Sequence, residues 1–535
     1  MNGDQPIYGV RNGVVSESLE IQTLIEKVRL HAGIRPERVA VHFNGKAISF
    51  GDVEKRANRV AHGLLAAGVG RHARFAVLSK NTPIFYDLLL GTAKVGAVLV
   101  PINYRLAPPE VAFILNDSTA EMLFVAPEFL PAIEGIRARL ESIRQVIVID
   151  EFQDAGDYAI WRDKQPSADP LLPVDLEAVT VQMYTSGTTG HPKGALLTHV
   201  NLAESLRGSV PVWGPWHYHD VILVCMPQYH IGASIWGMAG LSLGVESVLT
   251  ADFDAQRILR IIEEHRINKT QLASVMMRML LDDPACGSTN FSSLDLITYG
   301  AAPAPVDLVR RAQRVFGCGI GQGYGMTESA GTITYLSPED HADGDEKRLP
   351  SAGRAIDGVE IMIVGTNGEA LGPGELGEII CRGRQIMQGY WHLPEASAQV
   401  VQNGWFHTGD VGYVDEDGYL FVRDRVKDMI VSGGENIYPA EIENLLHSHP
   451  DIVDVAVIGI PDARWGESVK AIVVCRPGAS TNAEELIAFV RPHIAAYKVP
   501  RSVEFVATLP RNASGKILKR ELRQLYWANR DSKLI

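Results

Sequence analysis

The sequence predicts an α/β fold, in which a large N-terminal domain is followed by a small, mobile α+β C-terminal domain. A chain of 535 residues is too long for one compact core. Its first 120 residues alternate helix-like and strand-like patterns, which is typical of parallel βαβ units. The pattern changes over residues 359–422 and again after Asp424. We therefore expect an N-terminal domain over residues 1–424, a hinge over 425–427 and a C-terminal domain over 428–535.

The N-terminal part contains one clear amphipathic helix and several short apolar strands. Residues 51–67 carry an apolar stripe with helical spacing. Residues 75–78, 122–125 and 145–149 are short apolar runs that we interpret as strands of a parallel sheet. The stripe of the helix consists of Val53, Ala57, Val60, Ala61, Leu64 and Leu65.

Residues 359–422 and the C-terminal part have hydrophobic patterns that differ from that of the first 120 residues. Short apolar runs between glycine-rich turns predict a small antiparallel sheet or barrel over residues 359–422. The Asp-Glu-Asp-Gly sequence at 415–418 lies between two such runs and indicates a hairpin. The runs span residues 359–364, 378–381 and 419–422. The C-terminal part has strand-like residues 428–431 and 454–460 and helix-like residues 440–446 and 482–490.

Composition and charge exclude several classes of protein. Apolar residues make up 46% and charged residues 21%, which excludes a disordered, collagen-like or coiled-coil chain. The net charge of −13 argues against a nucleic-acid partner, because affinity for DNA depends on Lys and Arg that neutralise phosphates. A local basic pocket for a nucleotide is compatible with this charge.

The cysteines and the N-terminus indicate a cytoplasmic protein. Five scattered cysteines form no CxxC pair, which suits a reducing compartment and excludes a zinc ribbon or dithiol motif. The N-terminus lacks the basic and apolar regions of a secretory signal. The most apolar stretch, residues 88–101, is broken by Lys94 and is shorter than the ~20 residues that span a bilayer. We interpret it as a buried core segment and expect no transmembrane segment.

A loop rich in glycine and hydroxyl groups carries the strongest chemical signal. Residues 184–194 read YTSGTTGHPKG and lie between strand-like residues 179–183 and the apolar residues 195–198. Glycines let backbone N–H groups approach an anion, hydroxyl groups add donors, and a lysine adds positive charge. This combination suits a polyphosphate. The candidate phosphate-binding residues are Thr185, Ser186, Gly187, Thr188, Thr189, Gly190 and Lys193.

This loop is not a Walker A motif. That motif requires glycine before the lysine and serine or threonine after it, whereas Pro192 and Gly194 flank Lys193 here. A P-loop nucleotide hydrolase is therefore disfavoured by the residues themselves.

Five motifs in order resemble the adenylate-forming superfamily of acyl-CoA synthetases, adenylation domains and luciferases. The loop at 184–194 resembles its phosphate loop, and the sequences at 323–329, 404–410, 424–439 and 510–516 resemble its other motifs. The resemblance covers nearly the whole chain. It implies two α/β subdomains and a small β-barrel in the N-terminal domain, and a C-terminal domain that turns about the hinge at Lys427. It also implies an AMP-forming acyl-CoA ligase that uses ATP, Mg²⁺ and coenzyme A.

The resemblance assigns roles to the central motif and to residues 300–302. It implies that Glu328 is the Mg²⁺ ligand, and a hard carboxylate oxygen beside phosphates suits that ion. Thr327 is expected to bind the α-phosphate or the acyl carboxylate, and Tyr324 to offer a flat face to adenine. The residues expected to line the nucleotide and acyl pockets with them are Gly300, Ala301, Ala302, Gly323 and Gly325.

Further residues are assigned to the ribose, to catalysis and to the thiol. A carboxylate has two oxygens that can accept hydrogen bonds, so Asp410 is expected to bind both ribose hydroxyls, and Arg425 is expected to reach the same sugar. Lys516 is expected to enter the site during adenylation and to steady the carboxylate and the α-phosphate. Gly433 and Gly434 are expected to line the tunnel for the thiol arm, where a Cβ would obstruct it.

The acid is expected to have an apolar tail. His230 lies in a motif that resembles the opening of the acyl pocket, where it would gate the pocket or touch the carboxylate. Residues 233–244 contain no charged side chain, which disfavours an amino acid because its ammonium group would be buried without a partner. A medium- or long-chain fatty acid is the first choice, followed by aryl, arylpropenoic or steroid-derived acids. The expected lining is Ile235, Trp236, Met276 and Gly323.

Several alternatives remain open at this stage. The chain ends soon after Lys516 without a carrier module, so free coenzyme A is the simpler thiol, but a carrier protein supplied separately is also compatible. A luciferase-like oxygenase and a catalytically silent binding protein are further alternatives, and the full set of motif residues argues against the latter. A homodimer would leave no signature in the sequence.

Overall fold

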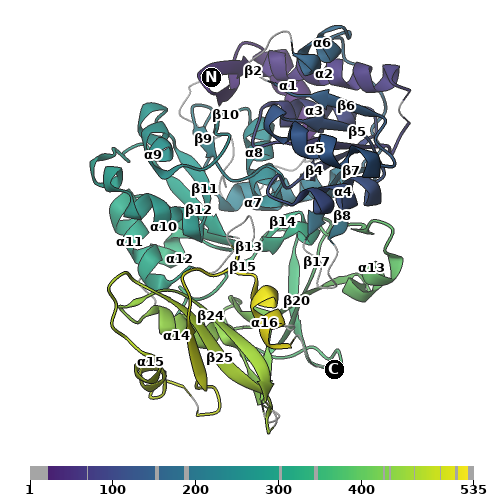
Figure 1. Cartoon of the computed structure of the whole chain (residues 1–535). Coiled ribbons are helices and arrows are strands. Elements are labelled where there is room, and N and C mark those ends of the chain that lie inside the picture. Colours follow the sequence, from purple (N-terminus) through teal and green to yellow (C-terminus); the bar gives the residue numbers. More distant parts are fainter. Residues whose placement is uncertain are drawn as a thin grey trace.

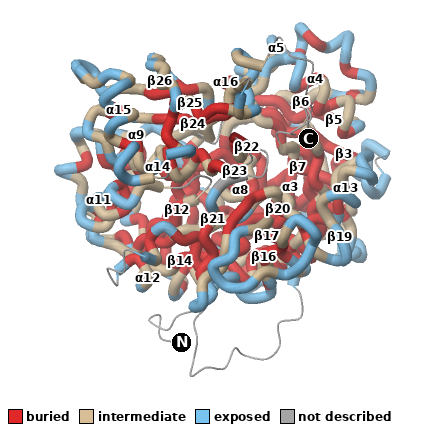
Figure 2. The backbone as a smooth tube through the Cα atoms, turned by 90° about the horizontal axis from the view of Figure 1, so that it is seen from below, coloured by how far each residue is buried: buried red, intermediate tan, exposed pale blue. Residues whose placement is uncertain are grey.

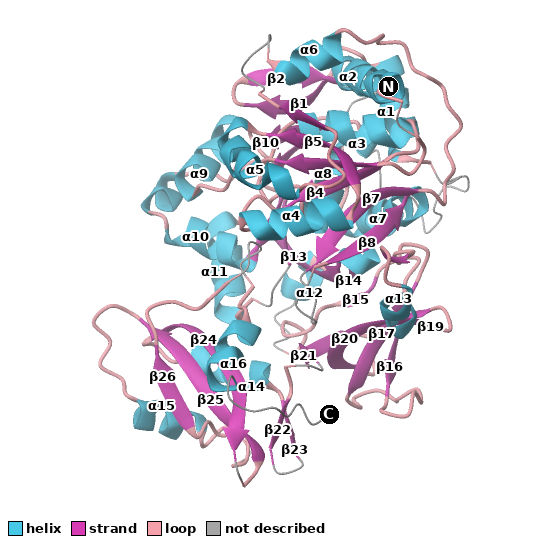
Figure 3. Ribbon diagram, turned by 45° about the vertical axis from the view of Figure 1, so that its right-hand side comes forward, coloured by secondary structure: helices cyan, strands magenta, loops and turns pink. Residues whose placement is uncertain are grey.

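In the computed structural model, the described residues form four sheets with helices packed between and around them (Figure 1). The large N-terminal part contains three of the sheets, and the C-terminal part contains the fourth (Figure 3). The structure describes residues 22–68, 70–150, 156–185, 192–300, 304–342, 347–425, 428–432, 435–462, 464–494, 496–511 and 516–527.

The first sheet carries the predicted phosphate loop. In the described part of the chain it has seven strands in the order β18-β8-β7-β4-β3-β5-β6, and β7, β4, β3, β5 and β6 are parallel. Helices α4 (Pro108–Asp117) and α5 (Leu130–Ile136) pack on its outer face. The strands are β3 (Arg74–Leu78), β4 (Val98–Ile102), β5 (Ala120–Val125), β6 (Gln145–Val148), β7 (Val179–Thr185), β8 (Lys193–Thr198) and β18 (Gly389–Tyr390).

The second sheet contributes the central motif. Its nine described strands run in the order β15-β14-β13-β12-β11-β9-β10-β1-β2, and the six strands from β13 to β1 are parallel. The strands are β1 (Val39–Phe43), β2 (Lys46–Ser49), β9 (Val221–Val224), β10 (Glu246–Leu249), β11 (Lys269–Ala273), β12 (Leu296–Gly300), β13 (Gly319–Met326), β14 (Gly331–Leu336) and β15 (Arg354–Ala355). Its outer face is covered by α9 (Ala255–Glu264), α10 (Ser274–Asp282) and α11 (Val306–Phe316).

One apolar core joins these two sheets. It contains side chains of both sheets and of the helices between them, and Figure 2 shows the buried backbone in red. Ser49 begins α2, because its hydroxyl accepts a hydrogen bond from Asp52 N. The helices are α1 (Leu24–Ile34), α2 (Phe50–Ala66), α3 (Ile84–Lys94), α7 (His199–Val212) and α8 (Ile231–Leu243).

The strands of the third sheet follow those of the second sheet in the sequence and precede the C-terminal part. Among the described residues it has five antiparallel strands, where the sequence predicts a small sheet or barrel. The predicted hairpin is confirmed: Gly418 N donates to Asp415 O across the turn that joins β20 and β21. The strands are β16 (Glu360–Val364), β17 (Gly377–Arg382), β19 (Val401–Gln402), β20 (Trp405–Val414) and β21 (Leu420–Arg425).

The C-terminal part is α+β, as predicted. Its sheet, with five strands in the residues that the structure describes, packs against α14 (Pro439–His447), α15 (Ala483–Val490) and α16 (Lys519–Trp527). Arg278 of α10 donates a hydrogen bond to the carbonyl oxygen of Val453, at 3.1 Å, and so joins this part to the N-terminal part. The strands are β22 (Ile430–Ser432), β23 (Glu435–Ile437), β24 (Ile452–Asp462), β25 (Gly466–Cys475) and β26 (Ser502–Phe505).

The predicted helices and strands agree with the structure, but one side chain that was predicted to be buried is exposed. Residues 51–67 form α2 and bury five of the six predicted apolar residues, but Leu65 is 41% exposed. It lies near the C-terminal end of the helix, where the neighbouring elements no longer cover it. No helix among the described residues is both long and apolar enough to cross a bilayer.

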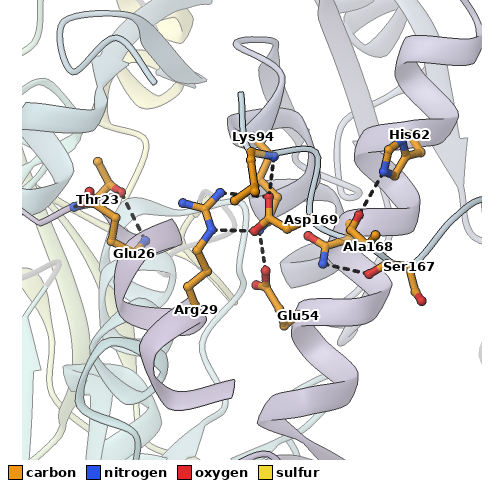
Figure 4. Close-up of polar contacts among 11 residues, drawn as sticks. Thr23, Glu26, Arg29, Glu54, His62, Lys94, Ser167, Ala168 and Asp169 are labelled. Carbon is orange, nitrogen blue, oxygen red and sulfur yellow. Dashed lines mark hydrogen bonds and ion pairs between the residues drawn. The ribbon is translucent and has the colours of Figure 1, made fainter. Parts of the chain in front are cut away.

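The most apolar stretch of the sequence is buried, and its lysine is held by an ion-pair network (Figure 4). The Lys94 side chain is 0% exposed and donates to Glu54 at 2.6 Å and to Asp169 at 3.0 Å. Arg29 also donates to Asp169, through two nitrogens. Burial works to raise the pKa of Asp169, but hydrogen bonds from Arg29, Leu171 N and Lys94 lower it below its ordinary value. The network therefore fastens the segment before β7 to α1, α2 and α3.

Replacing Lys94 by alanine is expected to reduce the free energy of unfolding by about 3–5 kcal/mol, because buried carboxylate groups would lose their shared partner. Urea denaturation followed by fluorescence measures this loss. Arg144→Ala is the control: its side chain is 80% exposed, and its surface pair with Glu121 contributes less than about 1 kcal/mol. Equal losses in the two variants would contradict the structural role given to Lys94.

Candidate functional site

Two paired strands hold the ends of the phosphate loop. Thr185, at the end of β7, lies opposite Lys193, at the start of β8, in an antiparallel pair. The predicted loop residues Ser186, Gly187, Thr188, Thr189 and Gly190 lie outside the described residues. The structure thus fixes the positions of the two strand ends that the loop connects.

Glu328 faces this loop entrance. It lies in the short 3-10 helix η4 (Thr327–Ser329) between β13 and β14. Its Oε1 accepts a hydrogen bond from Thr185 Oγ1 at 3.3 Å and from Tyr390 Oη at 2.9 Å. Lys193 Nζ lies 5.1 Å from the centroid of the Tyr390 ring. A carboxylate and an ammonium group therefore flank the position where the sequence predicts phosphates.

Tyr390 was missed by the sequence analysis. It is 62 residues from Glu328 in the chain, and the short strand β18 places it beside β8. The tyrosine of a Gly-Tyr-Trp sequence after a glycine-rich region was the available signal. Without the fold, nothing in that sequence indicates which residue its hydroxyl group contacts.

A partly buried network supports the strands on either side of the loop. Tyr184 Oη donates to Asp117 Oδ2 at 2.5 Å, and Gln182 Nε2 donates to Tyr184 Oη at 2.9 Å. Arg74 donates to Gln182 Oε1 at 3.1 Å, and its guanidinium carbon lies 3.3 Å from the centroid of the Trp391 ring. Burial lowers the pKa of Arg74 to about 10. The network holds Tyr184 rigidly beside Thr185.

Tyr324 and Asp410 form a second polar pair. Tyr324 Oη donates to Asp410 Oδ2 at 2.7 Å, and Asp410 is 5% exposed. Burial raises the pKa of Tyr324 well above its ordinary value, and the negative charge of Asp410 raises it further. Arg425 lies opposite Asp410 in the β20–β21 pair, so the backbone brings these two predicted residues together.

The glycines of the predicted pocket allow close backbone contacts. A Cβ on Gly300 would lie 2.7 Å from the carbonyl oxygen of Gly323, and one on Gly325 would lie 1.9 Å from that of Gly331. These distances are too short for any side chain at either position. Ala301 and Ala302 lie outside the described residues.

His230 precedes the first turn of α8 and carries a buried nitrogen without a protein partner. Its Nε2 is buried and has no hydrogen-bond partner among the described residues, and its ring contacts that of Tyr229 with 4.4 Å between centroids. Burial and, to a smaller extent, the positive charge of Arg105 lower the pKa of His230 to about 4. The imidazole is therefore neutral at pH 7. A buried polar atom usually has a partner, which a ligand would supply here.

The residues expected to line the acyl pocket divide into two groups. Trp236 points into the core, where its ring packs against Trp213 and Trp216 and its Nε1 donates to Leu223 O. Met276 instead packs against a small apolar cluster at the start of α8 and the end of β11. That cluster contains Met226, Ala233 and Ala273, with Val275 and Met276 against it. Trp236 is therefore a core residue, whereas Met276 belongs to the cluster that includes Ala233, three residues after His230.

The C-terminal residues of the prediction are only partly described. Lys516 precedes Ile517, which pairs with Arg511 in an isolated bridge of the C-terminal part. Gly433, Gly434 and the hinge residue Lys427 lie outside the described residues. The structure therefore brings together Thr185, Lys193 and Glu328, and separately Tyr324 with Asp410.

Known protein families and individual proteins match this chain along almost its whole length. A family model described as AMP-binding enzyme matches residues 28–391, and one described as AMP-binding enzyme C-terminal domain matches residues 441–516. Feruloyl-CoA synthase of Amycolatopsis sp is 41% identical over 501 residues, which cover 92% of this chain and 97% of that protein.

Two further proteins extend the comparison. The fatty acid–[acyl-carrier-protein] ligase ScoC of Streptomyces coeruleorubidus is 38% identical over 515 residues, 95% of this chain and 98% of that one. The crystal structure of ATP-bound MatB from Rhodopseudomonas palustris is similar with a TM-score of 0.87 at 29% identity, over 94% of this chain and 99% of that chain.

Proposed function

The chain belongs to the AMP-binding enzyme family and is an acid–thiol ligase, and from this premise we propose that it couples an apolar carboxylic acid to coenzyme A through an acyl adenylate. The observation that carries the proposal is the Glu328 carboxylate, which lies between Thr185 and Tyr390 at the entrance of the phosphate loop. ATP is the proposed nucleotide.

The first step makes the acid reactive. A carboxylate is a poor acyl donor, because a thiol would have to displace an oxide. We propose that a carboxylate oxygen attacks the α-phosphorus of ATP, that the bond to the β-phosphate oxygen breaks, and that pyrophosphate leaves. Two anions meet in this step, so positive charge and N–H donors are needed where negative charge builds up. We propose that Lys193, at the start of β8, and the loop residues before it supply them.

The second step transfers the acyl group. The thiol sulfur, having lost its proton, attacks the acyl carbon, and AMP leaves with the oxygen that joined them. We propose that the C-terminal domain, residues 428–535, turns about the hinge at 425–427 between the steps. Lys516 would act before this turn, and Gly433 and Gly434 would line the thiol tunnel after it.

Glu328 fits the requirements of a magnesium ligand. Its carboxylate is half-buried at the loop entrance, and its hydrogen bonds with Thr185 and Tyr390 use only Oε1. Hard carboxylate oxygens beside phosphates are the usual protein ligands of Mg²⁺. The ion would neutralise charge on the phosphates, while Thr185 and Tyr390 hold the carboxylate in place.

Asp410 and Tyr324 fit the nucleoside. Asp410 is almost fully buried and is held by Tyr324, so its carboxylate has a fixed orientation. We propose that it accepts hydrogen bonds from the ribose hydroxyls and that Tyr324 packs against adenine. Thr327 and the close backbones at Gly300 and Gly323 would complete the pocket.

A medium- or long-chain fatty acid is the proposed substrate. Helix α8 is free of charged side chains, and the cluster at its start is apolar. The likeness to a fatty acid–[acyl-carrier-protein] ligase supports this class and keeps a carrier protein as the alternative thiol. The greater identity to a feruloyl-CoA synthase supports an arylpropenoic acid as the second candidate.

Pyrophosphate release tests the proposal and ranks the acids. The purified chain is mixed with ATP, Mg²⁺ and coenzyme A, and medium- and long-chain fatty acids, arylpropenoic acids, steroid-derived acids and amino acids are compared. We expect release with an acid that has an uncharged tail and none with amino acids. Replacing coenzyme A by a carrier protein identifies the thiol. The absence of release with every acid would contradict the proposal.

Tyr390→Phe is expected to lower kcat/KM for pyrophosphate release about tenfold or more, because the Glu328 carboxylate loses a hydrogen bond. Steady-state kinetics over a range of Mg²⁺ concentrations measure the change. Tyr413→Phe, at a ring that stacks on Phe421 in the third sheet, is the matched control. Identical kinetics of the Tyr390 variant and the wild type would show that the hydroxyl group has no such role.

A further inference from the structure

A second cluster of potential ligand atoms lies in the turn between α7 and β9. His217, His219 and Asp220 each place one such atom within 4.8 Å of the other two. The two imidazole rings stack with centroids 5.2 Å apart, and His217 Nδ1 lies 3.7 Å from Asp220 Oδ1. Neither the phosphate loop nor the acyl pocket uses these residues.

The carboxylate of Asp220 is buried but only half satisfied. The residue is 1% exposed, and its Oδ2 accepts from Lys269 Nζ at 2.9 Å and from His217 N at 3.0 Å. Its Oδ1 is buried without a hydrogen-bond partner among the described residues. A buried carboxylate oxygen without a partner is costly, so this atom is expected to have one.

The cluster lies at the edge of the second sheet opposite to the proposed nucleotide site. Lys269, Leu296 and Gly319 are the first residues of the parallel strands β11, β12 and β13, whereas Gly300 and Gly323 lie toward their carboxyl ends. A cavity of about 640 Å³ opens at this edge and is lined by His217, Lys269 and these strand starts. An ion could therefore reach His217 from solvent without entering the nucleotide site.

We propose that His217, His219 and Asp220 bind one divalent transition-metal ion, with zinc as the representative. Two imidazoles and a carboxylate select such ions over Mg²⁺ and Ca²⁺, which prefer oxygen ligands alone. Asp220 Oδ1 would gain its missing partner, and the hydrogen bond from Lys269 to Oδ2 orients the carboxylate as outer partners do in metal sites. The Lys269 ammonium also repels a cation, so we expect weaker binding than at a four-ligand structural zinc site.

The ion would stabilise the contact of this turn with the segment between α1 and β1. Tyr218, between the two histidines, lies under the Arg35 guanidinium at 3.7 Å, and its carbonyl oxygen accepts a hydrogen bond from Arg38. Arg35 follows α1, and Arg38 precedes β1. Fixing His217 and His219 therefore also fixes the contact of this turn with the segment between α1 and β1.

Zinc titration of the full chain tests this site. The protein is prepared without a polyhistidine tag, treated with EDTA and dialysed, and then titrated calorimetrically with Zn²⁺ alone. We expect about one equivalent of Zn²⁺ to bind to the wild type. His219→Ala is expected to weaken zinc binding at least tenfold, because the loss of a metal ligand or of a residue that supports a ligand has an effect of this size. His219 is exposed, so this variant is expected to fold. Co²⁺ gives a second readout, since its visible absorption reports coordination by nitrogen.

Thermal unfolding and a matched histidine variant complete the test. Zn²⁺ should raise the unfolding temperature of the wild type and of His493→Ala, an exposed histidine in the C-terminal part, but not that of His219→Ala. An excess of Mg²⁺ should not displace the zinc. Equal zinc affinity in wild type and His219→Ala, or no binding by the wild type, would overturn the proposal.

Discussion

Lys516→Ala is expected to slow acyl-adenylate formation by about 10²–10³-fold, the loss typical when one group that stabilises transition-state charge is removed. The attack of coenzyme A on supplied acyl-AMP is expected to proceed at the wild-type rate. The reason is that the lysine is proposed to meet the carboxylate and the α-phosphate in the first step only. Rapid-quench assays of each half-reaction separate the two effects.

Arg520→Ala provides the control for this prediction. Arg520 is an exposed cation in α16, four residues after Lys516, so its removal changes the charge of the same region without touching the lysine. Both half-reactions should keep their wild-type rates in this variant. If Lys516→Ala slowed the two half-reactions equally, the proposed division of labour between the steps would be wrong.

Glu328→Gln is expected to lower kcat/KM for pyrophosphate release by at least about 100-fold, or about 2.7 kcal/mol of transition-state stabilisation. The amide keeps the shape of the side chain and can still accept from Thr185 and Tyr390, but it loses the charge that suits Mg²⁺. The Mg²⁺ concentration for half-maximal rate should rise in parallel.

Glu416→Gln makes the same chemical change at the exposed tip of the β20–β21 hairpin. It should leave both the rate and the Mg²⁺ dependence unchanged. A Glu328→Gln enzyme with a normal Mg²⁺ dependence but a low rate would assign Glu328 a role in positioning the loop and not in metal binding.

Periodicity and turn residues were sufficient to predict several of the elements. The stripe of α2, the short strands β3, β5 and β6 and the hairpin at Gly418 depend on neighbours within a few residues, and these local patterns are visible in the sequence. Leu65 was wrong because burial at a helix end depends on which other elements cover it.

Contacts between distant residues could not be predicted in the same way. Lys94 looked like an interruption of an apolar run, yet Glu54 and Asp169, from two other segments, let it be fully buried. Trp236 lies on a helix that is apolar on all sides, so its spacing did not indicate whether it faces the pocket or the other tryptophans. Tyr390 reaches Glu328 only because β18 pairs with β8.

The site residues that the motifs identified are a different case. Thr185, Lys193 and Glu328 lie close together, and so do Tyr324 and Asp410, although each group combines residues from separate parts of the chain. The resemblance supplied this grouping, because neither periodicity nor composition relates residues so far apart.

Isotope transfer tests the central claim, adenylate formation, most directly. The active acid is labelled with ¹⁸O in both carboxylate oxygens and converted to its thioester with unlabelled ATP, Mg²⁺ and coenzyme A, and the nucleotide product is analysed by mass spectrometry. We predict AMP that carries one ¹⁸O, because the attacking carboxylate oxygen leaves with phosphorus when sulfur displaces it. Unlabelled AMP, or ADP with the label in inorganic phosphate, would contradict the account.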